Sequence, residues 1–319
     1  MFRFAVTPPP LITVDAWRDH LHAIEDAGFD SVVLADHFTG GWDVEPMVAL
    51  TAAAGLTTRL RLQTGVLCND YRHPVLVHRM AATLDMVSRG RFVLGLGAGW
   101  LHSDYEAAGI PLDAPGTRIS RLEEAVGVIK ALFGPDPVDH AGAYYRISGL
   151  VGTPRAVQQP HPPIVLGGGS PRVLRMAGAH ADIVSIVASL RAGHTGPDSI
   201  ADLSACRVAE KVQWIREGVA AAGRNPEDVT ISINHWLVRI TKTEPEAAEF
   251  LDRVADRNRV DPALLAESPA VLVGTVERLV DVLTERRERY GFGHLQLDAG
   301  FPPSDIPSLF PLVDRLASR

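Results

Sequence analysis

The 319-residue chain has only two cysteines, few aromatic side chains and no long run of like charges. Cys68 and Cys206 cannot form a disulfide framework, and the twelve scattered histidines show no metal-binding spacing, so no metal site is predicted. The net charge of −7 and isoelectric point near 5.9 do not supply the basic surface that nucleic acids require. The chain lacks a signal-peptide core and any apolar stretch of the ~18 residues that span a membrane. We therefore expect a soluble, cytoplasmic protein without nucleic-acid or membrane partners.

Short apolar runs alternate with helical patterns along almost the whole chain. The predicted strands are residues 2–6, 31–35, 60–66, 92–96, 164–166, 183–187, 229–238 and 294–297, with a hairpin near 138–147. These runs lack polar alternation, which indicates parallel strands buried on both faces. Eight strand–helix units favour a TIM (β/α)8 barrel, an α/β fold, with residues 1–319 as a single domain. We expect loop insertions at 100–117, 136–162 and 189–204 on its carboxyl-terminal face.

Four of the predicted strands end in polar or glycine-rich clusters. The clusters are Asp36-His37-Phe38, Gly65-Val66-Leu67-Cys68-Asn69, Gly95-Leu96-Gly97-Ala98-Gly99-Trp100 and Gly167-Gly168-Gly169-Ser170-Pro171. The carboxyl ends of parallel strands meet on one face of a barrel, where such folds carry their chemistry. The sequence therefore predicts that all four clusters belong to one site.

Two of the clusters contain residue types suited to binding and proton transfer. At a barrel mouth, the carboxylate of Asp36 can bind a cofactor ring while His37 moves a proton near neutral pH. The alternative is a helix-capping aspartate beside a structural histidine. The glycines of 95–99 do not have the spacing of a Rossmann fingerprint, and we interpret them as backbone that approaches a flat ring closely.

The cluster at 167–172 is typical of an anion site, because three glycines, a serine cap and a proline open a helix and Arg172 adds charge. The alternative is a plain strand–helix turn. Arg72 follows a predicted strand and either supplies an arginine to an anionic cofactor tail or lies in a solvated loop. Arg118 and Arg121 are interpreted as the charged start of an exposed helix.

Together, these segments resemble the luciferase-like flavin and deazaflavin oxidoreductases, from the first strand to Gly293-His294. Asp36-His37 and the segment 100–115 resemble the branch that uses coenzyme F420. The resemblance implies a barrel, a homodimer, and coenzyme F420 or alternatively FMN bound at the strand ends.

The resemblance also implies a role for each matching residue. Asp36 would contact the ring, His37 would transfer the proton, and Gly65 and Val66 would be joined by a non-proline cis peptide bond. The remaining cofactor-binding residues implied are Cys68, Ala98 and Gly99 at the ring, and Gly168, Gly169, Ser170, Pro171 and Arg172 at the phosphate.

The chain departs from the family's sugar-phosphate dehydrogenase at Trp100, where that enzyme has an acid/base glutamate. An indole does not titrate, so Trp100 and His37 are expected to form a pocket for a small, fairly apolar organic substrate. We expect hydride transfer between the deazaflavin and that substrate. The alternatives are an FMN-dependent monooxygenase that receives electrons from a separate cofactor reductase, and a non-catalytic flavin-binding barrel.

Overall fold

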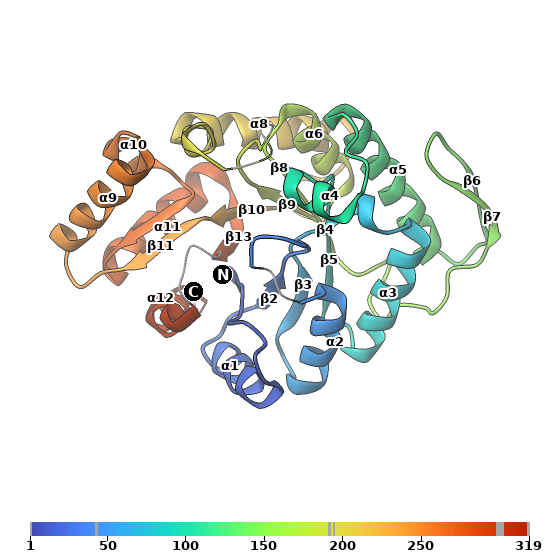
Figure 1. Cartoon of the computed structure of the whole chain (residues 1–319), viewed down its shortest axis with the longest axis horizontal. Helices are drawn as coiled ribbons and strands as arrows, with labels where there is room; N and C mark the ends of the chain where they lie inside the picture. Colours follow the sequence, from blue (N-terminus) through green and yellow to red (C-terminus); the bar gives the residue numbers. More distant parts are fainter. Residues whose placement is uncertain (1, 42–43, 191–192, 194, 298–302, 318–319) are drawn as a thin grey trace.

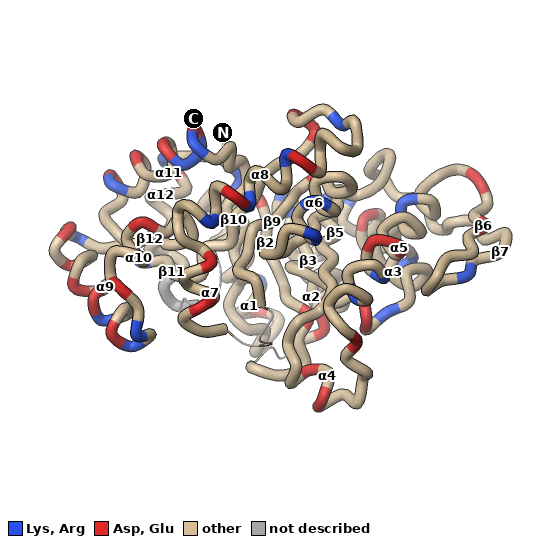
Figure 2. Tube along the Cα trace, turned by 90° about the horizontal axis from the view of Figure 1, so that it is seen from above, with Lys and Arg blue, Asp and Glu red and all other residues tan. Residues whose placement is uncertain are grey.

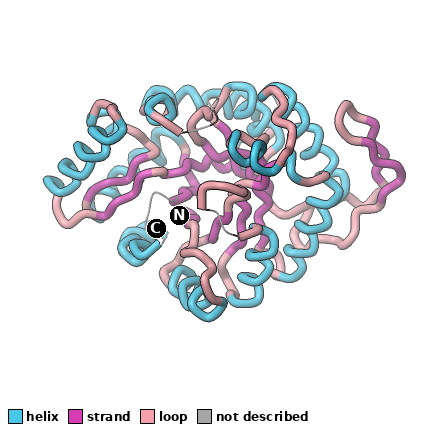
Figure 3. Tube along the Cα trace, in the orientation of Figure 1, coloured by secondary structure: helices cyan, strands magenta, loops and turns pink. Residues whose placement is uncertain are grey.

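The computed structural model of the chain describes residues 2–41, 44–190, 193, 195–297 and 303–317. Its central feature is a closed barrel of parallel strands surrounded by helices (Figures 1 and 3). The barrel strands are β1 (Arg3–Val6), β2 (Ser31–Leu34), β3 (Arg61–Thr64), β5 (Phe92–Gly97), β8 (Ile164–Gly168), β9 (Ile183–Ile186), β10 (Thr230–His235) and β13 (Phe292–Leu297). They follow the order β3-β2-β1-β13-β10-β9-β8-β5, and a β3–β5 pairing closes the ring. The predicted TIM barrel is therefore confirmed.

Helices between the strands form the outer layer of the barrel (Figure 3). They are α1 (Val14–Asp26), α2 (Pro46–Leu56), α3 (Pro74–Val87), α5 (Pro115–Phe133), α6 (Pro171–His180), α8 (Ala205–Ala221), α11 (Val276–Tyr290) and α12 (Phe310–Ala317). Shorter elements are β4 (Leu67–Cys68), α4 (His102–Ala108), α7 (Pro197–Ala201), η1 (Asn69–Tyr71), η2 (Pro226–Asp228) and η3 (Pro303–Leu309).

The amphipathic pattern explains how a typical outer helix packs. In α1, Trp17, Leu21 and Ile24 recur at helical spacing and are buried, while the Thr13 hydroxyl caps the first turn by accepting the Ala16 amide. Acidic and basic side chains are interspersed along α11 and along α9 (Glu244–Asn258) (Figure 2). Within the described ranges, no helix combines the length and apolar character that crossing a membrane demands.

The predicted strand at 229–238 was wrong in extent. The chain leaves the barrel at Trp236, and β11 (Leu237–Ile240) pairs in parallel with β12 (Val271–Gly274), a strand the sequence did not reveal. Helices α9 (Glu244–Asn258) and α10 (Pro262–Glu267) cover this small sheet and share a separate apolar core with it. Only Trp236 separates β10 from β11, and no glycine or proline lies between residues 229 and 240, so nothing local marks the break between the two strands.

The three predicted loop insertions lie on different parts of the barrel. Segments 100–117 and 189–204 contribute residues to the cavity at the carboxyl-terminal face, although 191–192 and 194 lie outside the described residues. The predicted hairpin forms from β6 (Val138–Ala141) and β7 (Arg146–Leu150), but it extends from the side of the barrel (Figure 1). It packs on α5 through a small apolar cluster, and none of residues 136–162 lines that cavity. The expectation that this loop covers the catalytic face was therefore wrong.

The barrel interior changes character along its axis. Val93, Val165 and Ile183 form a small internal apolar cluster, and Val165 pairs with Ile183 in register. Two residues further toward the carboxyl ends of these strands, Gly167 pairs with Ser185 in the same register. The apolar layer therefore closes the barrel below, while small and polar residues leave it open above.

Candidate functional site

A cavity of about 1090 Å³ opens at the carboxyl ends of the strands, within the part of the chain that the structure describes. The predicted site residues that line it are Asp36, His37, Gly65, Val66, Cys68, Ala98, Gly99, Trp100, Gly168, Gly169, Ser170 and Arg172. Pro171 does not line the cavity but lies in the first turn of α6. The structure therefore brings the four strand-end clusters together, because parallel strands deliver their carboxyl ends to one face.

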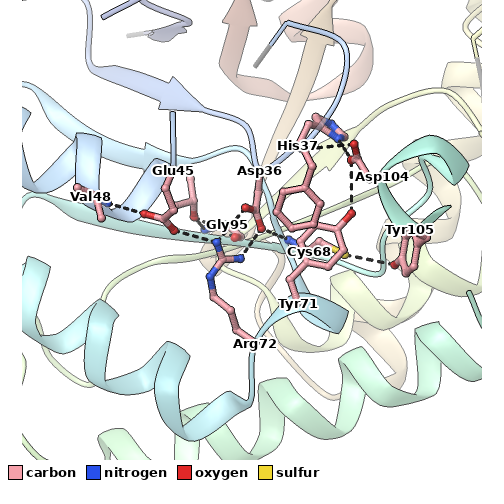
Figure 4. A network of polar contacts seen from close by, with 12 residues as sticks. Asp36, His37, Glu45, Val48, Cys68, Tyr71, Arg72, Gly95, Asp104 and Tyr105 are labelled. Carbon is pink, nitrogen blue, oxygen red and sulfur yellow. Dashed lines mark hydrogen bonds and ion pairs between the residues drawn. The ribbon is translucent and has the colours of Figure 1, made fainter. Parts of the chain in front are cut away.

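His37 is held by a buried carboxylate from a distant segment. Its Nδ1 lies 2.6 Å from Oδ2 of Asp104, which is in α4 (Figure 4). The other oxygen of Asp104 accepts the backbone amides of Phe38 and Thr39 at 3.1 and 2.9 Å. Although burial opposes it, hydrogen bonds from His37 and Thr39 hold the pKa of Asp104 below its ordinary value. An ionised Asp104 therefore accepts a hydrogen bond from Nδ1–H of His37, which leaves Nε2 as the ring nitrogen that exchanges a proton.

Asp36 forms an ion pair with Arg72. The guanidinium donates to both carboxylate oxygens, at 2.5 and 3.0 Å, and also to Glu45 at 2.8 Å (Figure 4). The same carboxylate accepts the Cys68 amide at 2.9 Å. Arg72 is therefore committed to structural partners, which contradicts both the cofactor-tail and the solvated-loop interpretations. Asp36 thereby ties the end of β2 to β4.

The predicted non-proline cis peptide bond is confirmed between Gly65 and Val66. Neighbouring glycines make room for this segment. A Cβ atom on Gly97 would lie 2.5 Å from a Val66 methyl carbon, and one on Gly95 would lie 1.9 Å from the Thr64 carbonyl oxygen. Packing of the chain on itself therefore requires these two glycines, while close approach of a flat ring to this segment stays a prediction.

Cys68 lines the cavity, and Tyr105 is buried behind it, against Gly99. The Cys68 thiol and Tyr105 hydroxyl are 3.3 Å apart, and Tyr105 donates to Asp70 at 3.0 Å. Burial raises the pKa of the Cys68 thiol to about 11, so it is neutral at physiological pH. Gly99 has φ of +76° and packs against Tyr105, so only glycine fits there without strain.

The turn between β8 and α6 presents backbone donors to the cavity. Within the described residues, the amides of Gly169, Ser170, Arg172 and Val173 donate no hydrogen bond, and all four residues line the cavity. Ser170 is the N-cap residue of α6, and its side chain makes no capping bond. The Arg172 guanidinium donates to the Gly116 carbonyl and Ser120 hydroxyl. This turn has the free amides and helix dipole of an anion site.

Apolar side chains line another part of the cavity. Trp100 packs edge-on against His37, with ring centroids 5.6 Å apart. The other apolar lining residues in this region include Leu101, Leu190, Ile200, Leu203 and Trp236. Arg118, predicted at an exposed helix start, is only 7% exposed and also lines the cavity. It donates to the Gly99 carbonyl at 3.4 Å, so that prediction was wrong for Arg118.

Sequence reasoning missed several lining residues on the barrel strands. They are Gln63, Ser185, Asn234, Gln296 and, just beyond β10, Trp236. Every second side chain of a barrel strand points into the barrel. Counting back in steps of two from a site residue at the strand end could therefore have identified these positions. Within the described ranges, no group of three histidine, cysteine or acidic side chains is placed to hold a metal ion.

Known proteins share this chain's sequence pattern and fold. The sequence profile of the luciferase-like monooxygenase family matches residues 2–289. The 4-hydroxyprotoasukamycin monooxygenase of Streptomyces nodosus subsp. asukaensis is 28% identical over 299 residues, covering 88% of this chain and 79% of that protein. The F420-dependent glucose-6-phosphate dehydrogenase of Mycolicibacterium gilvum (strain PYR-GCK) is 31% identical over 235 residues, covering 71% and 65%. The coenzyme F420 dependent tetrahydromethanopterin reductase of Methanopyrus kandleri aligns over 99% of this chain and 97% of that one, with a TM-score of 0.74 and 21% identity.

Proposed function

Because the chain belongs to the luciferase-like monooxygenase family, we propose that it is an oxidoreductase dependent on coenzyme F420. It transfers a hydride between the deazaflavin and a small, fairly apolar organic substrate. One observation carries the proposal: a single cavity holds both a turn of open amides and a histidine fixed by a buried carboxylate. The F420-dependent relative at 31% identity supports the choice of cofactor.

The residues present fit such a cofactor. The cavity of about 1090 Å³ is slightly larger than the range of about 300–1,000 Å³ found for cofactor and ligand sites, so it has room for a large cofactor. The amides of Gly169 and Ser170 are donors of the kind that bind a phosphate. The indole nitrogen of Trp236 is buried without a hydrogen-bond partner among the described residues, so it offers one more donor to a bound molecule.

We propose specific roles for the lining residues. Gly168, Gly169, Ser170 and Arg172, with Pro171 opening the helix, hold the phosphate. Gly65, Val66, Cys68, Ala98 and Gly99 line the ring. Asp36 contacts the ring while its carboxylate, bound by Arg72 and the Cys68 amide, holds this wall in place.

When bound, the deazaflavin supplies two-electron hydride chemistry. His37 takes or gives the accompanying proton through Nε2, while Asp104 holds Nδ1 and so fixes the imidazole orientation. The carboxylate also stabilises the imidazolium that forms when His37 accepts a proton. Trp100 and the apolar side chains of 189–204 exclude water and shape the substrate pocket.

A second candidate is an FMN-dependent monooxygenase that uses the same cavity and receives electrons from a separate reductase. The monooxygenase from Streptomyces nodosus, whose match covers 88% of this chain, favours it. Cofactor preference distinguishes the two candidates, since a deazaflavin supports hydride transfer but hardly reacts with oxygen.

The test is a titration of purified apoprotein with coenzyme F420 and, separately, with FMN, following tryptophan fluorescence. Trp100 lines the cavity, and Trp100→Phe shows which part of the quenching originates there. Micromolar binding of F420 with weak FMN binding supports the proposal. Tight binding of FMN alone supports the monooxygenase, and binding of neither overturns both candidates.

We further propose that residues 1–319 act as one domain in a cytoplasmic homodimer. The barrel strands nearest the two ends of the chain, β1 and β13, pair in parallel, so closure of the barrel needs both. The partners proposed are a small-molecule substrate and, for the monooxygenase alternative, a cofactor reductase.

A further inference from the structure

A fully buried lysine lies directly behind the turn between β8 and α6. The side chain of Lys211, in α8, has 0% exposure. Its ammonium donates to the carbonyl oxygen of Gly169 at 2.6 Å, to that of Val187 at 3.3 Å, and to Oδ2 of Asp202 at 2.6 Å. Lys211 therefore connects the ends of two neighbouring barrel strands to the segment that borders the cavity.

Asp202 extends this connection to the cavity wall. Its Oδ2 accepts the Ser189 amide at 2.7 Å in addition to the Lys211 ammonium. Its Oδ1 accepts the Arg207 guanidinium at 3.2 Å. The single negative charge of Asp202 is thus shared between two cations, Lys211 and Arg207, and one amide. Asp202 therefore does not fully neutralise the positive charge of Lys211.

The contact with Gly169 sets the direction of the next amide. In a trans peptide, the carbonyl oxygen and the following N–H point to opposite sides of the chain. Because the Gly169 carbonyl points back to Lys211, the Ser170 N–H points forward, and Ser170 lines the cavity. Gly169 itself must be glycine, since a Cβ atom there would lie 2.4 Å from the backbone of Ala188 and Ser189.

Helices α6 and α8 are packed closely enough to keep this geometry. A Cβ atom on Gly178 would lie 2.3 Å from the Ile215 carbonyl oxygen, and one on Gly218 would lie 2.0 Å from that of Arg175. The two backbones therefore touch at both glycines. The lysine on α8 and the open amides at the start of α6 form one rigid unit.

A buried ammonium costs desolvation free energy, and it acts over a longer range in a low-dielectric interior than at the surface. Burial lowers the pKa of Lys211, while the adjacent Asp202 carboxylate opposes that shift. The hydrogen bonds to two carbonyls and one carboxylate satisfy all three ammonium protons. The charge is therefore held in one place, behind the amides.

We propose that Lys211 is a positioning residue for the cofactor phosphate, because it orients the Ser170 amide toward the cavity and places a buried positive charge behind it. This inference rests on the proposed function, since it assumes a phosphate-bearing cofactor in the cavity. The ligand chemistry it selects is a phosphate monoester or diester on a flat ring system. Lys211 acts through the Gly169 peptide and the electric field, without touching the ligand.

The test compares ligands with and without the phosphate, and FMN and riboflavin differ in that group alone. Wild-type and Lys211→Met apoproteins are titrated with coenzyme F420 and its phosphate-free deazaflavin riboside, and in parallel with FMN and riboflavin. We expect Lys211→Met to weaken binding of the phosphate-bearing form about tenfold or more, while the phosphate-free form binds as to wild type. Thermal unfolding of each variant checks that the barrel is folded.

Lys130→Met is a matched control. Lys130, in α5, is half-buried, and its ammonium donates to the His180 carbonyl at 2.5 Å, at the far end of the same helix α6. We expect Lys130→Met to change stability but not the ratio of the two affinities. If Lys211→Met does not fold, Lys211→Gln carries the same comparison, since its amide still donates a hydrogen bond but has no charge.

The outcomes separate the two proposals. Equal weakening of phosphate-bearing and phosphate-free ligands by Lys211→Met, or no weakening of either, overturns the role of Lys211 while the cofactor assignment stands. If Lys130→Met weakens the phosphate-bearing form selectively, to the same extent as Lys211→Met, the role of Lys211 is overturned as well. If the wild-type protein binds none of the four ligands, the proposed function is wrong and this inference is wrong with it.

Discussion

The imidazole of His37 and the carboxylate of Asp104 are joined across 67 residues of sequence by a contact of 2.6 Å between Nδ1 and Oδ2. The Asp104 side chain is completely buried, whereas His37 keeps 17% of its side chain exposed toward the cavity. Asp104 also accepts the two amides that follow His37. One carboxylate thus sets both the ring orientation and the path of the loop that carries it.

We expect Asp104→Asn to lower turnover roughly 10²-fold with little change in cofactor affinity, because the amide no longer fixes the Nδ1–H tautomer. ¹⁵N NMR of the His37 ring reports the tautomer directly, without a substrate. Turnover is then measured with any substrate that reduces or oxidises the bound cofactor.

Ser103→Ala is the control for this substitution. Ser103 contacts the Thr39 hydroxyl at 2.8 Å in the same loop but does not bond to His37. An unchanged His37 tautomer in Asp104→Asn, or an equal loss of turnover in Ser103→Ala, contradicts the positioning role.

The sequence was informative wherever a site residue follows its strand directly. Asp36, His37 and Gly169 are fixed by the strands that precede them, so recognition of a barrel was enough to gather them. Asp104 was not assigned a role, because it reaches His37 only through the tertiary placement of a short helix. Trp236 was missed since its position depends on where β10 ends, and that break has no local signature.

The charged residues were harder to predict than the glycine turns. Arg72 and Arg118 were predicted from their surroundings in the sequence, yet each is buried or half-buried against partners from other segments. Long side chains reach several ångströms from their own backbone. Their partners are therefore set by the fold and not by neighbouring residues.

Gly97 and Val66 provide a test of the packing beneath the cavity. We expect Gly97→Ala to destabilise the protein by about 1–3 kcal/mol, because its Cβ would lie 2.5 Å from a Val66 methyl carbon. Adding Val66→Ala removes that methyl group and should restore most of the loss. Urea unfolding of the two single variants and the double variant measures the coupling free energy.

Gly95→Ala serves as the comparison. Its Cβ would meet the Thr64 carbonyl oxygen, which is backbone, so Val66→Ala should not rescue it. Rescue of both glycine variants, or of neither, would show that the Val66 contact does not limit the packing.

Three buried histidines make the fold sensitive to mild acid. Burial lowers the pKa of His294 and His235 to about 3 and that of His78 to about 4, against about 6.5 in an unfolded chain. As pH falls below 6.5, these histidines become protonated in the unfolded state but stay neutral in the folded state. The free energy of unfolding therefore decreases. Between pH 7.5 and 5.5, each histidine should contribute a loss of about 1.4 kcal/mol.

Urea unfolding at the two pH values measures this loss for the wild type and for His294→Asn. The variant should lose about 1.4 kcal/mol less than the wild type, since one proton-binding group is absent from its unfolded state. His20→Asn, which removes an exposed histidine, is the control. Greater stability at pH 5.5 than at pH 7.5, or no difference between wild type and His294→Asn, would contradict the prediction.

The outward face of α2 and α3 is the surface on which we expect the homodimer to form. Val48 is 71% exposed and Leu76 is 49% exposed, on two helices that lie side by side in Figure 1, and Met86 and Val87 continue the apolar surface along α3. A symmetric dimer presents the same patch from both subunits, so the interface would bury two copies of each apolar side chain, one from each subunit.

Val48→Glu places two carboxylates in that contact and should convert the dimer to a monomer at micromolar concentration. Size-exclusion chromatography with light scattering measures the mass, and Val151→Glu, on an exposed valine near β7, should leave it unchanged. A monomeric wild type, or a dimer that survives Val48→Glu but not Val151→Glu, would rule out this surface as the interface.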